Sequence, residues 1–66
     1  MYIKSNFKQV LLTRGISQTE LGKELNVSPQ QMNNWVNGRT KPRIETLFYI
    51  ASLLECKVDE LYKLVK

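Results

Sequence analysis

The stretch from Ser17 to Thr40 constrains the fold of this chain more than any other part of its 66 residues. Ser17-Gln18-Thr19-Glu20 and Ser28-Pro29-Gln30-Gln31 each place an N-cap serine three residues before Glu or Gln, which is the pattern of a capping box. The proline of the second pattern also suits the first helical position. Asn26, between the two starts, belongs to the few residue types besides glycine that tolerate a left-handed turn. The stretch therefore predicts two short helices joined by a tight turn, the second running over residues 29–37.

The second of these helices has an unusual polar face. Four neutral amides follow helical spacing on one side: Gln30, Asn33, Asn34 and Asn37. Three apolar residues that we expect in the core lie on the other side: Met32, Trp35 and Val36. Asparagine is a poorer helix former than Glu, Lys or Gln, so a face selected only for solubility would not use three of them. An amide donates and accepts at once, which suits the edge of adenine in the DNA major groove. The face predicts base reading, with a neutral solvated surface as the alternative.

Composition excludes several classes of function. One cysteine and no histidine leave no intramolecular disulfide, no transition-metal site and no Ser–His or Cys–His nucleophile, so neither an enzyme nor a cofactor is expected. Cys56 is interpreted as a small hydrophobic residue rather than a redox switch. The chain shows no signal peptide and no apolar run of membrane length, so we expect a cytoplasmic protein with no membrane partner. Residues 1–66 are expected to form one domain. Its core is small, so dimerisation would help to stabilise it.

The charge is unevenly distributed. The formal net charge is +4, and residues 1–43 hold seven basic and two acidic residues, whereas residues 44–66 hold three basic and four acidic ones. The excess of positive charge therefore accompanies the amide helix, which favours a nucleic-acid partner more than the net charge alone. The basic run Arg39-Thr40-Lys41-Pro42-Arg43 could also be an ordinary solvated turn.

Apolar periodicity predicts three further helices and no strand. We expect a first helix over residues 3–14, ended by Gly15, with a later start capped by Ser5 and frayed or extended first residues as the alternative. A last helix is expected over about 58–65. Residues 44–55 are apolar on most sides and predict the central buried helix. Gly22 lies inside the helix that begins at Gln18, where glycine costs about 1 kcal/mol relative to alanine, so we expect another helix to approach closely there. The result is a compact, all-α, five-helix domain.

These residues together resemble the Cro/repressor-type, or XRE-like, helix-turn-helix proteins. The resemblance rests on Ser17-Gln18-Thr19-Glu20-Leu21 and on Trp35-Val36-Asn37-Gly38-Arg39-Thr40-Lys41-Pro42. It is extended over nearly the whole chain by Leu47, Ile50, Ala51, Leu54 and Val58-Asp59-Glu60-Leu61. It implies a lambda-repressor-like fold with the helix-turn-helix at helices two and three.

In this family the third helix enters the major groove while the N-termini of helices two and three touch the DNA backbone. By position, the resemblance implies base reading by Gln30, Asn33 and Asn34. It implies contacts to the backbone or the groove edge by Ser17, Gln18, Ser28, Gln31, Asn37, Arg39, Thr40, Lys41 and Arg43. The expected partner is double-stranded DNA carrying a pseudo-palindromic operator, and no small-molecule ligand is expected.

Five positions depart from the common family pattern. Leu11 and Val36 replace a frequent Arg–Glu pair with an apolar contact, and Gly22 stands where alanine is usual. Pro29 occupies a position that often reads a base, so readout is expected to shift further along the helix. Arg43 replaces the usual Ser or Thr cap of helix four and adds a cation near the DNA.

The family often makes its two-fold contact near the C-terminus. We expect a homodimer through Leu61, Tyr62, Leu64 and Val65, with a fully core-directed last helix as the alternative. The expected function is a dimeric transcriptional repressor of a bacterium, phage or mobile element that acts by occupying its operator. The main rival is an antitoxin or other interaction module that binds a partner protein through its C-terminal helix. A basic amphipathic membrane binder is less consistent, because the cationic side lacks an opposing exposed apolar face.

Overall fold

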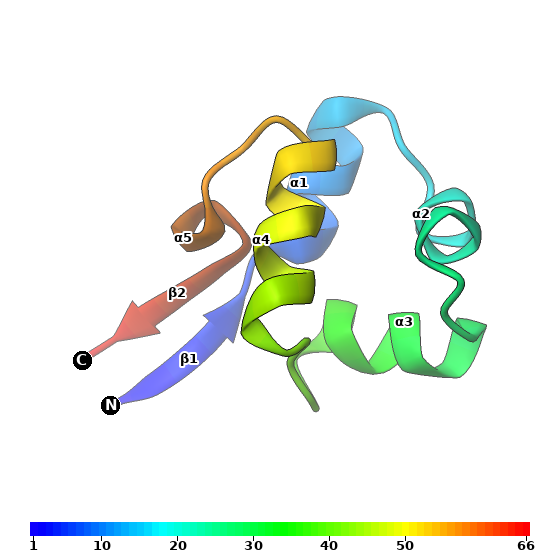
Figure 1. Cartoon of the computed structure of the whole chain (residues 1–66). Helices are drawn as coiled ribbons and strands as arrows, with labels where there is room; N and C mark the ends of the chain where they lie inside the picture. Colours follow the sequence, from blue (N-terminus) through cyan, green and yellow to red (C-terminus); the bar gives the residue numbers. More distant parts are fainter.

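Five helices and two terminal strands make up this computed structural model, which describes all residues from Met1 to Lys66 (Figure 1). The helices are α1 (Phe7–Arg14), α2 (Gln18–Leu25), α3 (Pro29–Asn37), α4 (Ile44–Leu53) and α5 (Val58–Leu61). The strands are β1 (Tyr2–Ser5) and β2 (Tyr62–Val65). The predicted helical class, with five helices and the tight turn between α2 and α3, is confirmed.

Local signals determine where α2 and α3 begin and where α1, α2 and α3 end. The capping box of α2 is present: the Glu20 amide donates to Ser17 Oγ at 3.0 Å, and the Ser17 amide donates to Glu20 Oε1 at 3.3 Å. Gly15, Asn26 and Gly38 end α1, α2 and α3 with φ angles of 67°, 57° and 77°. These predictions are confirmed because each depends on hydrogen bonds within a few residues.

The two ends of the chain differ from the prediction. Helix α1 begins at Phe7 rather than at residue 3, and α5 is a single turn that stops at Leu61 rather than at residue 65. The remaining segments form an antiparallel two-stranded sheet, called here the terminal sheet. Its register pairs Tyr2 with Val65, Ile3 with Leu64, Lys4 with Lys63 and Ser5 with Tyr62. The prediction of no strand was wrong, because each strand gains its backbone partner only from the opposite end of the chain.

The core joins the terminal sheet to the helices. Its fully buried large side chains come from four helices and the residue after α4: Phe7, Met32, Ile50, Leu54 and Leu61. The ring of Phe7 meets the ring of Tyr62 edge-on, with centroids 6.0 Å apart and planes at 73°. The first residue of β2 is therefore part of the core.

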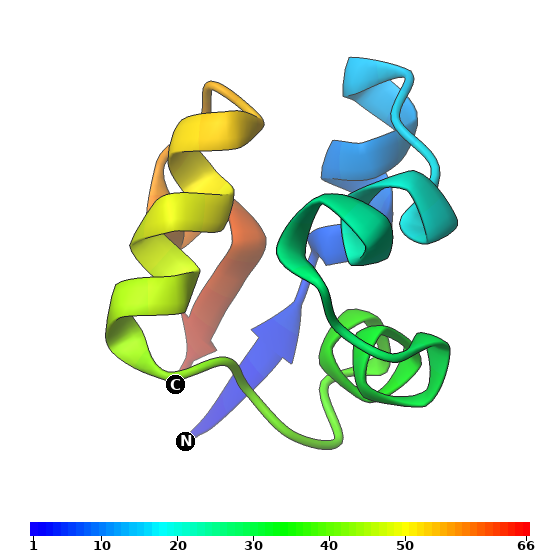
Figure 2. The same cartoon turned by 45° about the vertical axis from the view of Figure 1, so that its right-hand side comes forward.

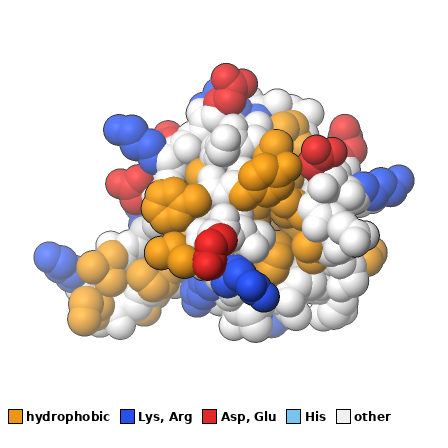
Figure 3. Space-filling model, in the orientation of Figure 1, with side chains coloured by type: hydrophobic (Ala, Val, Ile, Leu, Met, Phe, Trp, Pro, Cys, Tyr) orange, Lys and Arg blue, Asp and Glu red, His pale blue; other side chains and the backbone are white.

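Helix α4 lies at the edge of the core, and its prediction as the central buried helix was wrong. It ends at Leu53, and within it only Ile50 and Ala51 are buried. Ile44 and Phe48 are 66% and 58% exposed. Figure 3 shows hydrophobic side chains gathered over this side of the molecule. Apolar composition alone did not reveal that no element of the chain covers this side.

The terminal sheet projects from the helical body. In Figures 1 and 2 its free end, where both termini lie, reaches down to about the level of α3. The molecule is accordingly elongated, with extents of 33 × 22 × 21 Å. None of the helices has both the length and the apolar character needed to traverse a membrane.

Candidate nucleic-acid interface

The inner side of α3 is held rigidly by the core. Met32, Trp35 and Val36 are 1%, 7% and 6% exposed, as expected from their spacing. A Cβ added at Gly22 would lie only 2.9 Å from Met32 Cγ, so glycine is what allows α2 and α3 to pack this closely. The close approach predicted at Gly22 is confirmed. Leu11 and Val36 lie in the same buried cluster, which agrees with an apolar contact in place of the charged pair.

The outer side of α3 carries the four amides, here called the amide face. They form two hydrogen-bonded pairs four residues apart: Gln30 Nε2 donates to Asn34 Oδ1 at 3.3 Å, and Asn37 Nδ2 donates to Asn33 Oδ1 at 3.1 Å. Gln30 and Asn37 are exposed, whereas Asn33 and Asn34 are half-buried. Such pairs stabilise a helix by about 0.2–0.5 kcal/mol each, which offsets part of the cost of asparagine. The amides are therefore oriented before any partner arrives.

The first turn of α3 is capped locally. Ser28 Oγ accepts a hydrogen bond from the Gln31 amide at 3.2 Å, and Pro29 occupies the first helical position. The proline ring has no hydrogen-bonding group, so Pro29 cannot read a base edge through a hydrogen bond. In the caps Ser17 and Ser28 act as acceptors, which leaves both hydroxyl protons free to donate. Both helix N-termini therefore present a free hydroxyl donor.

The Gln31 part of the predicted capping box was wrong. The Gln31 side chain does not return to the Ser28 backbone. Instead Gln31 Oε1 accepts a hydrogen bond from Thr40 Oγ1 at 3.4 Å. Gln31 therefore joins α3 to the loop that follows it.

The last turn of α3 is held by the terminal sheet. Ser5 Oγ donates to the carbonyl of Val36 at 2.7 Å, and the Tyr62 hydroxyl donates to the carbonyl of Trp35 at 2.8 Å. Carbonyls in the last turn of a helix lack some of their intrahelical partners, so these two hydroxyls complete the C-terminal end of α3. Burial raises the pKa of the Tyr62 hydroxyl to about 12, so it remains a donor at neutral pH.

The loop from Arg39 to Arg43, called the basic loop, folds back on α3. The Arg39 amide donates to the Asn34 carbonyl at 2.9 Å, and Lys41 Nζ donates to the Gly38 carbonyl at 3.1 Å. Pro42 is buried, whereas the three cations of the loop are exposed. Arg43 is the N-cap residue of α4 without a side-chain capping bond, as predicted. The loop therefore presents positive charge at the C-terminal end of α3.

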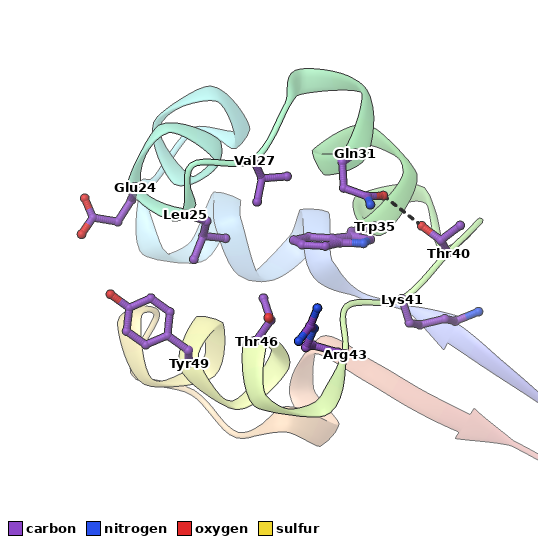
Figure 4. Close-up of a pocket in the computed structure, with 10 residues that line it drawn as sticks. All are labelled: Glu24, Leu25, Val27, Gln31, Trp35, Thr40, Lys41, Arg43, Thr46 and Tyr49. Atoms are coloured by element: carbon purple, nitrogen blue, oxygen red, sulfur yellow. Dashed lines mark hydrogen bonds between the residues drawn. The ribbon is translucent and has the colours of Figure 1, made fainter.

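A partly open hollow of about 470 Å³ lies behind the basic loop, between α2, α3 and the start of α4 (Figure 4). Trp35, Leu25 and Val27 supply apolar parts of its lining, and Lys41 and Arg43 supply cations. Gln31 points toward Thr40 on this side. Gln31 is therefore oriented toward the basic loop.

Comparison with known proteins places the chain in a family. A sequence model of the helix-turn-helix family matches residues 7–61. The chain belongs to the XRE-type helix-turn-helix family. A candidate DNA-binding protein from Bacteroides fragilis has a similar solved structure, with a TM-score of 0.85 and 19% identity, covering 94% of this chain and 100% of that one. At this identity the similarity concerns the fold. No sequence among curated proteins matches the chain.

Membership of this helix-turn-helix family supports a DNA-binding transcription regulator. The structure places most of the predicted site residues on α3 or on the segments directly before and after it. The amide face lies on α3, Ser28 begins that helix, and the basic loop follows it. Ser17 and Gln18 begin α2, the other helix of the motif. Which of these residues contact DNA stays a prediction.

The residues predicted at a dimer contact fall into two groups. Leu61 and Tyr62 are 0% and 8% exposed, so their side chains belong to the core of one chain and are unavailable to a second copy. Leu64 is 53% exposed and Val65 is half-buried. The alternative of core-directed side chains therefore holds for Leu61 and Tyr62, because the chain leaves the helical path directly after Leu61.

Cys56 has the environment of a hydrophobic residue. It is half-buried against the core, and burial, with the nearby Glu60 carboxylate, raises the pKa of its thiol despite the opposing effect of Arg14. A protonated thiol is a poor nucleophile. This environment agrees with the interpretation of Cys56 as a packing residue.

The sequence reasoning missed the terminal sheet as part of the site. Ser5 and Tyr62 anchor it to α3, and the sequence assigned no role to its two lysines, Lys4 and Lys63. The available signal was the pair of short runs Tyr2-Ile3-Lys4-Ser5 and Tyr62-Lys63-Leu64-Val65, which mix polar and apolar residues at the chain ends.

Proposed function

We propose that this protein is a sequence-specific, double-stranded DNA-binding repressor that acts as a homodimer by occupying its operator. The amide face carries this proposal. Its side chains are oriented by mutual hydrogen bonds, its back is buried in the core, and exposed cations follow it in the basic loop. Phosphate contacts by such cations position a protein on the duplex, whereas contacts to base edges select the sequence.

The free groups of the amide pairs match adenine. Within the first pair, Gln30 Oε1 remains a free acceptor and Asn34 Nδ2 a free donor. Adenine offers the N6 amino group as a donor and N7 as an acceptor in the major groove. The second pair leaves Asn33 Nδ2 and Asn37 Oδ1 free in the same way. Each pair can therefore bind one adenine edge without breaking its internal hydrogen bond.

A second copy of the chain is proposed to cover apolar surface outside the core. The strongest candidates are Ile44 and Phe48 on α4 and Leu64 on β2, all more than half exposed. Exposed apolar patches in a small soluble protein frequently mark an interface. The dimer would place two copies of α3 about one turn of DNA apart, so that each reads one half-site.

A second candidate function uses the same apolar surface for a different protein. An antitoxin or interaction module would dock its partner there rather than on a C-terminal helix, since α5 is one turn long and its Leu61 is buried. Tight binding of the product of a neighbouring gene without any DNA footprint would favour this candidate.

The proposal is tested by selecting bound duplexes from a random pool while measuring the mass of the free protein. We expect a dimer and a pseudo-palindrome whose half-site centres lie about 10 bp apart, with adenines facing the amide face. A pool that shows no enrichment, or a consensus made only of G·C pairs, would contradict it.

A further inference from the structure

The terminal sheet and the residues at its free end carry basic side chains and no acidic ones. Residues 1–5 and 62–66 contain Lys4, Lys63 and Lys66 and no acidic residue. All three lysines are exposed. The opposing carboxylates of the C-terminal third all lie before β2, in α4, α5 and the loop between them. The sheet is therefore complementary to a polyanion.

Two of these lysines stand directly opposite each other. Lys4 pairs with Lys63 in the strand register, so both side chains point to the same face of the sheet. Like charges in this arrangement destabilise a sheet. Tyr2 and Val65 share the face of the two lysines, whereas Ile3 and Leu64 lie on the other face with Ser5 and Tyr62. Leu64, the residue of the sheet proposed to contact a second copy, is therefore on the face opposite the lysines.

The sheet is also connected to α3 by hydrogen bonds. Ser5 and Tyr62, the pair next to the two lysines, are the residues whose hydroxyls hold the carbonyls of the last turn of α3. Gly38 allows this approach, since a Cβ there would lie 3.3 Å from Ser5 Cβ. Any DNA position taken by α3 therefore sets the position of Lys4 and Lys63 as well.

The direction of the sheet suits a contact with the same duplex. The buried side of α3 packs against the helical body, which lies above α3 in Figures 1 and 2, so the opposite side of α3 is turned away from that body. The free end of the terminal sheet lies at about the level of α3 in both views. Four residues of strand span about 13 Å, and the lysine side chains extend this reach.

We propose that Lys4 and Lys63 on the terminal sheet bind phosphates of the DNA beyond the C-terminal end of α3. The contact adds affinity without reading sequence, and Lys66 at the free end of the sheet extends it. The proposal rests on DNA binding through α3, and it adds a second contact surface that the helix-turn-helix motif does not contain.

The double variant Lys4→Gln/Lys63→Gln tests this surface. Binding is measured as a function of salt on a random duplex and on a selected operator. Each phosphate contact contributes about −0.9 to the slope of log K against log salt concentration. We therefore expect the slope of the double variant to be shallower by about 1.8 per protomer on both duplexes. The Lys4→Arg/Lys63→Arg variant should restore it. Lys57→Gln removes one exposed lysine from the segment between α4 and α5, away from α3, and should leave the slope unchanged (Figure 1).

An unchanged slope in the double Gln variant would overturn the proposal. If that variant instead changes the mass of the free protein while the slope per protomer stays constant, the lysines control association between copies and the proposal is wrong. Failure of base reading gives a different result: the wild-type protein would then bind both duplexes equally, while the difference in slope between variants would persist.

Discussion

The α2–α3 pair and the terminal sheet are built in opposite ways, although they meet at one end of α3. Every cap of the pair comes from residues within five positions of it, such as Ser28 for α3 and the box of Ser17 and Glu20 for α2. The sheet joins residues 2–5 to residues 62–65, and it holds α3 through Ser5 and Tyr62. Both ends of α3 are therefore capped locally, and its C-terminal end is additionally anchored by long-range hydrogen bonds from Ser5 and Tyr62.

A substitution at Leu61 tests how strongly the terminal sheet and its contacts with α3 depend on the core. Replacing this fully buried residue with alanine should lower the free energy of unfolding by about 2–5 kcal/mol, because the packing of α5 beside the sheet is lost. Chemical denaturation measures this change. Leu64→Ala is the matched control, and at 53% exposure it should cost less than about 1 kcal/mol. Equal losses for the two variants would show that Leu64 is buried in solution by a second copy.

The stability that the Tyr62 hydroxyl gives to the folded protein should depend on pH. Because its pKa is raised in the folded protein to about 12 from an ordinary value of 10.0, the folded state keeps a proton that the unfolded state loses. Below pH 10 the tyrosine is protonated in both states, and the free energy of unfolding keeps its full value. As the pH rises from 10 toward 12, the free energy of unfolding falls by about 2–3 kcal/mol. Denaturation of wild type and Tyr62→Phe at several pH values measures it.

The two stability curves should therefore converge between pH 10 and pH 12. Tyr49→Phe, a change at an exposed position, is the control: its free energy of unfolding should fall between pH 10 and pH 12 as that of the wild type does. A constant separation between wild type and Tyr62→Phe across this range would contradict the role of the buried hydroxyl.

Ser28 tests the local side of the comparison. Ser28→Ala removes the acceptor of the Gln31 amide and should cost about 1 kcal/mol of folding stability, whereas Ser28→Asp should retain most of it. Denaturant midpoints of the three proteins give the answer. If the Ser28→Asp variant is as unstable as Ser28→Ala, the cap contributes little and the start of α3 depends on tertiary packing instead.

The features that could be predicted from the sequence are the local ones, and the features that could not are the long-range ones. The capping box of Ser17 and Glu20, the turn at Asn26 and the buried back of α3 are short-range or periodic features, and all were predicted. The strands were not, because Tyr2–Ser5 alone fits either a frayed helix end or a strand, and only pairing with Tyr62–Val65 decides.

The exposure of α4 could not be predicted for a related reason. An apolar segment with helical spacing in a short chain predicts a buried helix. The remaining elements, however, cover only the side of α4 that carries Ile50 and Ala51. Likewise, Leu61 and Tyr62 share apolar character with Leu64 and Val65, and only the change from helix to strand separates the core residues from the exposed ones. The amide pairs were visible as spacing, but their mutual hydrogen bonds required side-chain positions.

The central claim is that α3 reads bases through its amides, and the most direct measurement compares Asn33→Ala and Asn34→Ala on the selected operator and on a random duplex. Folding stability should change by no more than about 0.5 kcal/mol, since the better helix propensity of alanine offsets the lost amide pair. Affinity for the operator should fall by about 1–3 kcal/mol for each variant, with little change on random DNA. Equal losses on both duplexes would contradict base reading by this face.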